Sequence, residues 1–206
     1  MTFKDRADAA EQLTRALRPW RGRHPVVCAI PRGGVPMAKI IAQALEGELD
    51  VVLSRKLGAP GNPELAIGAI GESGWILLDE VGHSLAPEYI EEAAAREARL
   101  IAERRAQYTP ARAPVALRGR VVIVVDDGLA TGSTMIAALH DLRGRQPAEL
   151  VCAVPVAASE AADRVAALAD HFVCLIRADD FRGVSQFYGN FRQVSDAEVM
   201  SALSTP

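Results

Sequence analysis

The sequence predicts an α/β domain of three layers, in which a mainly five-stranded parallel sheet lies between helices. Uninterrupted apolar runs of strand length alternate with segments of helical periodicity, a pattern typical of a parallel sheet buried on both faces. The spacing of strand, helix and strand near the N-terminus also matches a βαβ unit, which makes its strands parallel. The expected strands are 26–30, 49–53, 120–125, 149–156 and 171–176.

Helices are expected before and between these strands. The long helix carries acidic residues early and arginines late, as the helix dipole favours, and its charged face is expected to be exposed to solvent. The last helix is predicted from a capping box formed by Ser195 and Glu198. The expected helices are 3–17, 36–45, 87–107, 133–142, 159–169 and this short C-terminal one.

The region from about residue 57 to residue 86 departs from this alternation. Residues 57–74 contain five glycines and two prolines. Ala66–Ile70 and Trp75–Leu78 are predicted to pair as a hairpin across the Gly71-Glu72-Ser73-Gly74 turn. We interpret 57–86 as an excursion from the main sheet, either a flexible loop or a purely structural hairpin. The chain is expected to be a single domain over 1–206, with its core at about 20–176 and a small C-terminal unit at about 177–206.

Composition excludes several classes of protein. With 206 residues, 50% hydrophobic and 24% charged, the chain resembles an ordinary globular domain. A net charge of −3 gives no electrostatic case for nucleic acid as the main partner. No apolar run approaches the length of a membrane span, and the N-terminus lacks the apolar core of a signal peptide. Cys28, Cys152 and Cys174 lack metal-ligand spacing and are expected to be buried reduced thiols, which fits a cytoplasmic location.

The most informative segment is Val121–Thr134. Five consecutive β-branched apolar residues lead directly into Asp126 and Asp127, and the loop Ala130-Thr131-Gly132-Ser133-Thr134 follows before a helical pattern. Such a loop at a helix N-terminus offers backbone N–H groups and hydroxyls to an anion. Two solvated turn acids would explain the carboxylates alone, but the ordered combination with the loop favours a sugar phosphate site. Neither of the better-known phosphate-loop patterns, GxxxxGK[ST] or GxGxxG, occurs at this place.

Polar segments follow three of the predicted strands. Pro31-Arg32-Gly33-Gly34 follows the first strand, Arg55-Lys56 follows the second, and the acids and their loop follow the third. Because ligands of open α/β sheets bind beyond the carboxyl ends of the strands, these segments are expected at one edge of the domain. Taken singly, an Arg-Gly-Gly sequence is more often an ordinary turn, and cations at strand ends are usually solvated.

Residues 121–134 resemble the phosphoribosyl-diphosphate (PRPP) binding motif of the type I phosphoribosyltransferases. That motif is an apolar strand, two acids, variable residues and then Thr-Gly-x-Thr/Ser, which Asp126–Thr134 matches throughout. The order of elements from residue 26 to about 176 also resembles the five-stranded parallel sheet of the family.

The resemblance implies a role for each segment. Asp126 and Asp127 would bind the ribose hydroxyls, and Ala130, Thr131, Gly132, Ser133 and Thr134 would hold the 5′-phosphate. The turn with Arg32 and Gly33 corresponds to the pyrophosphate loop, which in the family often contains a non-proline cis peptide, and Arg55 and Lys56 would meet the diphosphate. The excursion occupies the place of a flexible loop that closes over substrate, although it is longer here than in simple members.

The C-terminal unit resembles the "hood" that selects the acceptor base in the family. Phe181, Val184, Phe187 and Tyr188 are the candidates for contact with a planar ring. They would equally serve as a small hydrophobic cap. The four histidines, at positions 24, 83, 140 and 171, show no metal spacing, and solvated or core roles are favoured for them.

The function implied is transfer of the phosphoribosyl group from PRPP to a purine- or pyrimidine-type base, with release of pyrophosphate. Mg²⁺ is the expected cofactor, bound mainly through PRPP, with Asp126 or Asp127 as candidate ligands. The expected partners are PRPP and a nitrogenous base, without nucleic acid or membrane, in a homodimer as is common in the family. A non-catalytic PRPP or nucleotide sensor is the main alternative. A hydrolase of a phosphorylated sugar is a third, and the length argues against a PRPP synthase.

Overall fold

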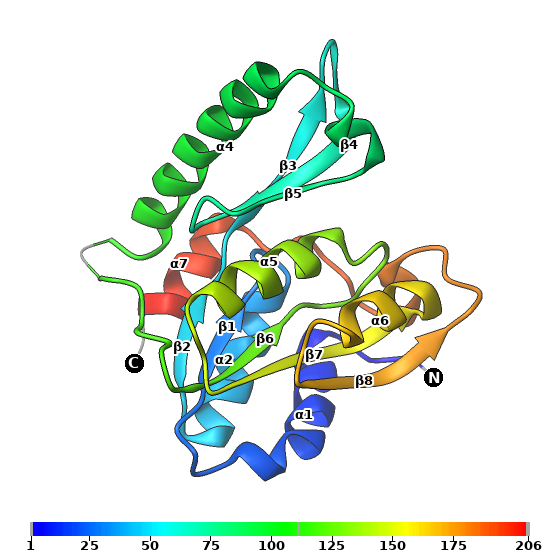
Figure 1. Ribbon diagram of the computed structural model, residues 1–206. Helices are drawn as coiled ribbons and strands as arrows, with labels where there is room; N and C mark the ends of the chain where they lie inside the picture. The colour runs from blue at the N-terminus through cyan, green and yellow to red at the C-terminus, as the bar shows by residue number, and fades with distance from the viewer. Residues whose placement is uncertain (1, 111, 205–206) are drawn as a thin grey trace.

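The main sheet is parallel and five-stranded, as predicted. A computed structural model describes residues 2–110 and 112–204. Neighbouring strands pair in parallel throughout this sheet (Figure 1). In spatial order they are β2 (Glu48–Val51), β1 (Val26–Ala29), β6 (Val121–Val125), β7 (Glu149–Ala158) and β8 (His171–Ala178).

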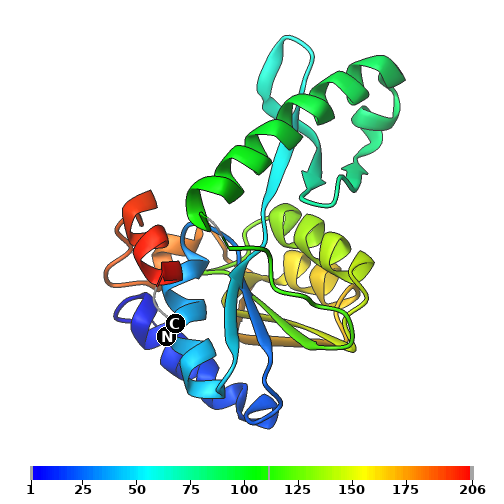
Figure 2. The same cartoon turned by 90° about the vertical axis from the view of Figure 1, so that its left-hand side faces the viewer.

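Helices cover both faces of this sheet and complete the three layers. The residues of α1 (Arg6–Ala16), α2 (Gly34–Leu45) and α7 (Asp196–Ser204) join one apolar cluster, and α5 (Ser133–Gly144) and α6 (Ser159–Ala166) join the other. Figure 2 shows the two sets on opposite sides of the sheet. Two short 3-10 helices, Arg18–Trp20 and Val184–Phe187, lie after α1 and after β8.

Strand β6 illustrates why the continuous apolar runs predicted this sheet correctly. All five of its residues are buried. Ile123 and Val125 pack into the cluster on the α1 and α2 side, whereas Val122 and Val124 pack into the cluster on the α5 side. Since successive side chains of a strand point to opposite faces, a strand covered on both faces needs apolar residues at every position.

The excursion is larger than the sequence suggested. The predicted hairpin is confirmed as β4 (Asn62–Gly71) and β5 (Ile76–Leu78), which pair antiparallel across residues 71–74. A further strand, β3 (Ser54–Ala59), pairs with β4, so Arg55 and Lys56 lie inside a strand and not in a loop after β2. Helices α3 (Glu80–His83) and α4 (Pro87–Tyr108) follow. These elements, residues 54–108, form an arm that projects beyond the sheet (Figures 1 and 2).

Ion pairs fasten the base of this arm to the core. Arg105 of α4 donates to Asp50 of β2 at 2.8 Å and to both oxygens of Glu72, in the β4–β5 turn, at 2.5 and 2.6 Å. Arg145, which follows α5, lies 3.1 Å from Glu72 and 2.7 Å from Asp141. Asp50 is 2% exposed and Asp141 is 0% exposed, so the arm is attached through buried charges. The charged residues of helix α4 are therefore not all exposed to solvent, in contrast to the prediction, because Arg105 pairs with acids at the junction with the core.

The ends of the chain differ in detail from the prediction. The N-terminal helix begins at Arg6, where Asp5 accepts from the N–H groups of Ala7 and Asp8, while Phe3 forms an isolated bridge with Tyr188. The predicted capping box is confirmed, since the Ser195 N–H donates to Glu198 at 2.9 Å and the Glu198 N–H donates to Ser195 at 3.2 Å. None of the described helices is long and apolar enough to cross a membrane.

Candidate phosphoribosyl site

The turn after β1 lies directly against the two acids. The N–H of Ile30 donates to the carbonyl of Val125 at 2.9 Å, which joins the ends of β1 and β6. The Pro31–Arg32 peptide is cis. A Cβ on Gly33 would fall 1.8 Å from an Asp127 carboxylate oxygen, and one on Gly34 would fall 2.5 Å from the Val125 carbonyl. Glycine at both positions therefore allows the turn to reach Asp126 and Asp127.

Asp127 is held by an arginine from the N-terminal helix. The Nε and Nη2 atoms of Arg6 donate to one oxygen of Asp127 at 2.9 and 2.7 Å, with 12% and 15% of the two side chains exposed. The Arg6 guanidinium lies 4.0 Å from the centre of the Phe191 ring. The Tyr188 hydroxyl donates to the Asp127 carbonyl at 2.6 Å. Asp127 is thus held at its carboxylate by Arg6 and at its carbonyl by Tyr188, which favours a positioning role.

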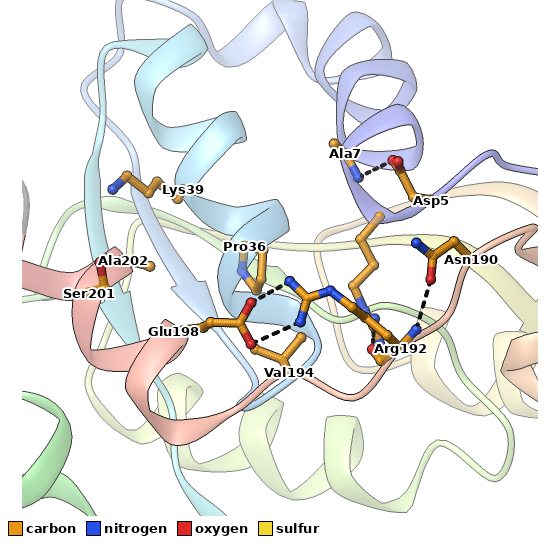
Figure 3. A pocket seen from close by; sticks show the side chains of 11 residues that line it. Asp5, Ala7, Pro36, Lys39, Asn190, Arg192, Val194, Glu198, Ser201 and Ala202 are labelled. Carbon is orange, nitrogen blue, oxygen red and sulfur yellow. Dashed lines mark hydrogen bonds and ion pairs between the residues drawn. The ribbon is translucent and has the colours of Figure 1, made fainter.

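Arg6 also lines a cavity of about 440 Å³ between α1, α2 and α7. Figure 3 shows other residues that line this cavity, among them Arg192 and Glu198. Nη1 of Arg6 donates to the carbonyl of Arg192 at 2.8 Å, and Arg192 in turn is ion-paired with Glu198. These contacts fix the guanidinium that holds Asp127. Sequence reasoning missed Arg6, because nothing distinguishes this arginine from the others in the chain.

Asp126 faces the loop that the motif predicted as an anion site. It lines a cavity of about 170 Å³ together with residues 128–135 and Val184. One of its oxygens accepts from the N–H of Asp127 at 2.8 Å. Burial, and next the charge of Asp127, raise the pKa of the Asp126 carboxyl well above its ordinary value. Burial also raises the pKa of Asp127, against the opposing effect of Arg6.

The loop from Ala130 to Thr134 has the geometry of an anion site. Gly132 adopts a left-handed conformation with φ of 75° and directly precedes α5, a helix of 12 residues. The hydroxyls of Thr131 and Ser133 lie 3.2 Å apart, and both side chains are exposed. Ser133 and Thr134, the first residues of α5, line the same cavity as Asp126, and the helix dipole favours negative charge there.

A cationic cavity of about 330 Å³ adjoins this loop. Thr134 lines both this cavity and the one that Asp126 lines, so the two meet at the start of α5. The basic side chains that line the cationic cavity are Arg32 from the turn after β1, Arg55 from β3 and Arg104 from α4. Arg55 also donates to Glu97 at 2.6 Å. Lys56 is exposed on β3 and is not among the residues that line this cavity.

The four predicted hood residues serve different roles. Val184 lies over the loop, since a Cβ on Gly128 would fall 2.7 Å from it. The rings of Phe181 and Phe187 lie 5.4 Å apart, and Phe181 lines a further cavity beside Ala130 and Thr131. Tyr188, in contrast, is 7% exposed and packs between Phe3 and Phe191 at 5.5 and 4.9 Å. The Tyr188 ring therefore packs against other side chains of the protein, as expected for a hydrophobic cap.

The described part of the chain contains no group of three or more histidine, cysteine, aspartate or glutamate side chains placed to hold a metal ion. The three cysteines are unpaired, with Cys28 and Cys152 buried. Burial raises the pKa of the Cys28 thiol to about 12, which keeps it protonated.

The fold and the site define an α/β protein with a loop suited to an anion beside paired acids. A family model for the phosphoribosyl transferase domain matches residues 3–192, and the chain belongs to that family. A putative phosphoribosyl transferase of Mycobacterium tuberculosis is 41% identical over 204 residues, covering 98% of this chain and 46% of that protein. The chain thus spans about half the length of the curated relatives that it matches.

Solved structures show the same fold. The protein TT1426 from Thermus thermophilus is 44% identical and aligns with a TM-score of 0.86 over 98% of both chains. A hypothetical protein from Neisseria gonorrhoeae with bound ppGpp aligns with a TM-score of 0.53 at 14% identity, over 99% of this chain and 94% of that one. Because the alignment with TT1426 covers nearly the whole chain, it includes both the arm and the core.

Proposed function

We propose that the protein transfers the phosphoribosyl group of PRPP to a nitrogenous base and releases pyrophosphate. The observation that carries this proposal is the junction at Thr134, where the loop cavity lined by Asp126 meets the cavity lined by three arginines. A ligand with a phosphate at one end, a ribose in the middle and a diphosphate at the other end matches this order of groups.

Each part of the site would act through position and charge. The loop 130–134 and the first N–H groups of α5 would hold the 5′-phosphate, and Asp126 would accept from a ribose hydroxyl. Cleavage of the C1–O bond leaves positive charge on the sugar and negative charge on the diphosphate. The carboxylate of Asp126 favours the first, while Arg32, Arg55 and the N–H of Gly33 favour the second. No protein nucleophile is required.

Mg²⁺ fits this donor set as a cofactor carried by the substrate. Mg²⁺ is usually held by one or two carboxylates together with substrate phosphates. Asp126 offers such a carboxylate beside the loop, and Asp127 is already engaged by Arg6. The ion would neutralise part of the diphosphate charge. The expected homodimer and cytoplasmic location are further proposals, supported by the family's common behaviour and by the unpaired cysteines.

Calorimetric titration with PRPP and Mg²⁺ tests the proposal. Wild-type protein is expected to bind, and Asp126→Asn is expected to weaken binding by about tenfold or more, since a hydrogen bond to a charged group is lost. Asp163→Asn is a matched control, because this exposed carboxylate pairs with Arg177 on β8. Absence of binding by wild-type protein, or equal binding by Asp126→Asn, would overturn the proposal.

Turnover separates the transferase from its main rival. Pyrophosphate release with a panel of purine and pyrimidine bases is expected to exceed release without any base. Tight PRPP binding with no release on any base would favour a PRPP sensor. Release that is independent of base would favour a hydrolase, in which water takes the place of the acceptor.

A further inference from the structure

A single carboxylate lies among the arginines of the cationic cavity. Asp196 is the first residue of α7, and one of its oxygens accepts from Nη1 of Arg104 at 3.0 Å and from the Tyr108 hydroxyl at 2.5 Å. Its other oxygen lies 4.0 Å from Nη1 of Arg32. The hydrogen bond from Tyr108 lowers the pKa of the Asp196 carboxyl, so it is ionised at neutral pH.

Three distant parts of the chain converge on this carboxylate. Arg32 comes from the turn after β1, Arg104 comes from the arm, and Asp196 comes from the C-terminal helix. The side chains of Asp196, Arg32 and Arg104 are 35%, 36% and 40% exposed. Ion pairs with this exposure contribute little to stability, at about 0–1 kcal/mol. Stability alone therefore gives little reason for the convergence.

Ligand chemistry gives a better reason. Two of the three arginines of the cavity share one internal carboxylate, and the third is paired with Glu97 outside its lining. A guanidinium matches phosphate oxygens with a bidentate geometry, and such pairs are stronger than a single hydrogen bond to a carboxylate. A diphosphate in this cavity would compete directly with Asp196 for Arg104 and Arg32.

We propose that Arg104 is a further diphosphate-binding residue, and that Asp196 is an internal counter-anion that a diphosphate displaces from it. This inference rests on the proposed function, because it assigns the cavity to the diphosphate of PRPP. It adds two residues to the site that lie outside the predicted motif, one on the arm and one on α7. Binding of the diphosphate then breaks the ion pair between the C-terminal helix and the arm.

Titration with inorganic pyrophosphate and Mg²⁺ tests this directly. Asp196→Asn removes the competing charge and is expected to tighten pyrophosphate binding about two- to fivefold, as expected for loss of an exposed like charge. Arg104→Gln is expected to weaken it about tenfold, as loss of a charged hydrogen-bond donor does. In the double variant, the gain from Asp196→Asn is expected to shrink, because Arg104 is no longer there to be released.

The controls keep the result specific. Arg96→Gln removes another exposed arginine of α4, one that contacts Glu97 and does not line the cavity, and is expected to leave binding unchanged. Arg104→Lys keeps the charge but not the bidentate guanidinium, so its pyrophosphate affinity is expected to lie between those of Arg104→Gln and wild type. This variant replaces Arg104→Gln in the test if Arg104→Gln does not fold. Hydrogen exchange of residues 195–204 is expected to rise when pyrophosphate binds.

Two outcomes would overturn the inference. Pyrophosphate affinity that is unchanged or weaker in folded Asp196→Asn would show that this carboxylate does not compete with the ligand. Equal affinity in Arg104→Gln and wild type would remove Arg104 from the site. If either outcome is found while PRPP still binds to wild-type protein and fails to bind to Asp126→Asn, only this inference fails and the proposed function stands. If PRPP does not bind to wild-type protein, the proposed function itself fails.

Discussion

The central strands of the core are held by apolar burial, whereas the attachment of the arm combines apolar packing with buried ion pairs. In the core, strands β1 and β6 are buried at every position, and their side chains feed two apolar clusters. The apolar interior of the arm, around Leu57 and Ile67, belongs to the same cluster as the α1 and α2 side of the sheet. The arm also meets the core through the ion pairs of Asp50, Glu72, Arg105, Asp141 and Arg145. Apolar burial tolerates small changes of geometry, whereas a buried ion pair depends on each partner.

The difference bears on the predicted flexible loop. The turn at residues 71–74, which the sequence suggested as part of a lid, lies against α5. The N–H of Ser73 donates to Asp141 at 2.5 Å, and a Cβ on Gly71 would fall 2.7 Å from the same carboxylate oxygen. The ring of Trp75 stacks on His140 with centroids 4.2 Å apart. These contacts favour the structural alternative for the turn of the β4–β5 hairpin.

The largest expected effect is on the core. Ile123 of β6 is completely buried, so Ile123→Ala is expected to lower the free energy of unfolding by about 3 kcal/mol, through lost burial and a cavity. Urea unfolding followed by circular dichroism measures this. Leu100→Ala on α4 is the control, since 37% of that residue is exposed and a loss below about 1 kcal/mol is expected. Equal losses would contradict the assignment of this stability to burial of Ile123.

The second effect concerns binding at the edge of the core. Gly33→Ala places a Cβ 1.8 Å from the Asp127 carboxylate, so the turn or the acid must move. We expect PRPP affinity to fall about a hundredfold, a loss of about 2.7 kcal/mol, because misplaced site groups lose their alignment. Gly58→Ala is the counterpart in the arm, where a Cβ would fall 2.7 Å from the Pro63 carbonyl. Its PRPP affinity is expected to stay within about twofold of wild type.

The third effect breaks the ionic attachment of the arm. Arg105→Gln leaves Asp50 and Glu72 without their shared cation and is expected to cost about 2 kcal/mol. The value is below that of a fully buried pair because Arg112 also reaches Asp50 at 3.3 Å and Arg105 is 11% exposed. Hydrogen exchange should increase across residues 54–108 and change little in β6. Uniform faster exchange, including the core strands, would show that the arm and core are one cooperative unit.

The smallest effect has the opposite sign. The pKa of Asp126 is raised in the folded protein, so the native state binds more protons than the unfolded one between the two pKa values, and stability falls as pH rises through that window. Asp126→Asn removes this cost and is expected to stabilise the protein at pH 7 by about 1 kcal/mol. Thermal unfolding of both proteins at several pH values measures it. The gain should disappear below about pH 4, where the carboxyl is protonated in both states. A gain that persists there would assign the effect to packing.

Much of the fold could be predicted because its signals are local. The central strands β1 and β6 are unbroken apolar runs, and the box at Ser195 and Glu198 fixes the start of α7 within four residues. The motif at 126–134 likewise contains its acids, loop and helix start in one stretch. Strand β3 was missed because Ser54–Ala59 is polar at its start and includes glycine, so its strand character depends on pairing with β4.

Local sequence was enough to define the parallel sheet, the hairpin and the motif that the chain shares with the phosphoribosyl transferase family. The side chains that complete the site were found only from the folded arrangement. Arg6 is 121 residues from Asp127, and Arg104 is 92 residues from Asp196. The local sequence around an arginine does not identify its partner, because the partner depends on how the elements that carry the two side chains pack together. Apolar periodicity encodes burial along one segment, whereas an ion pair between segments exists only once the chain has folded.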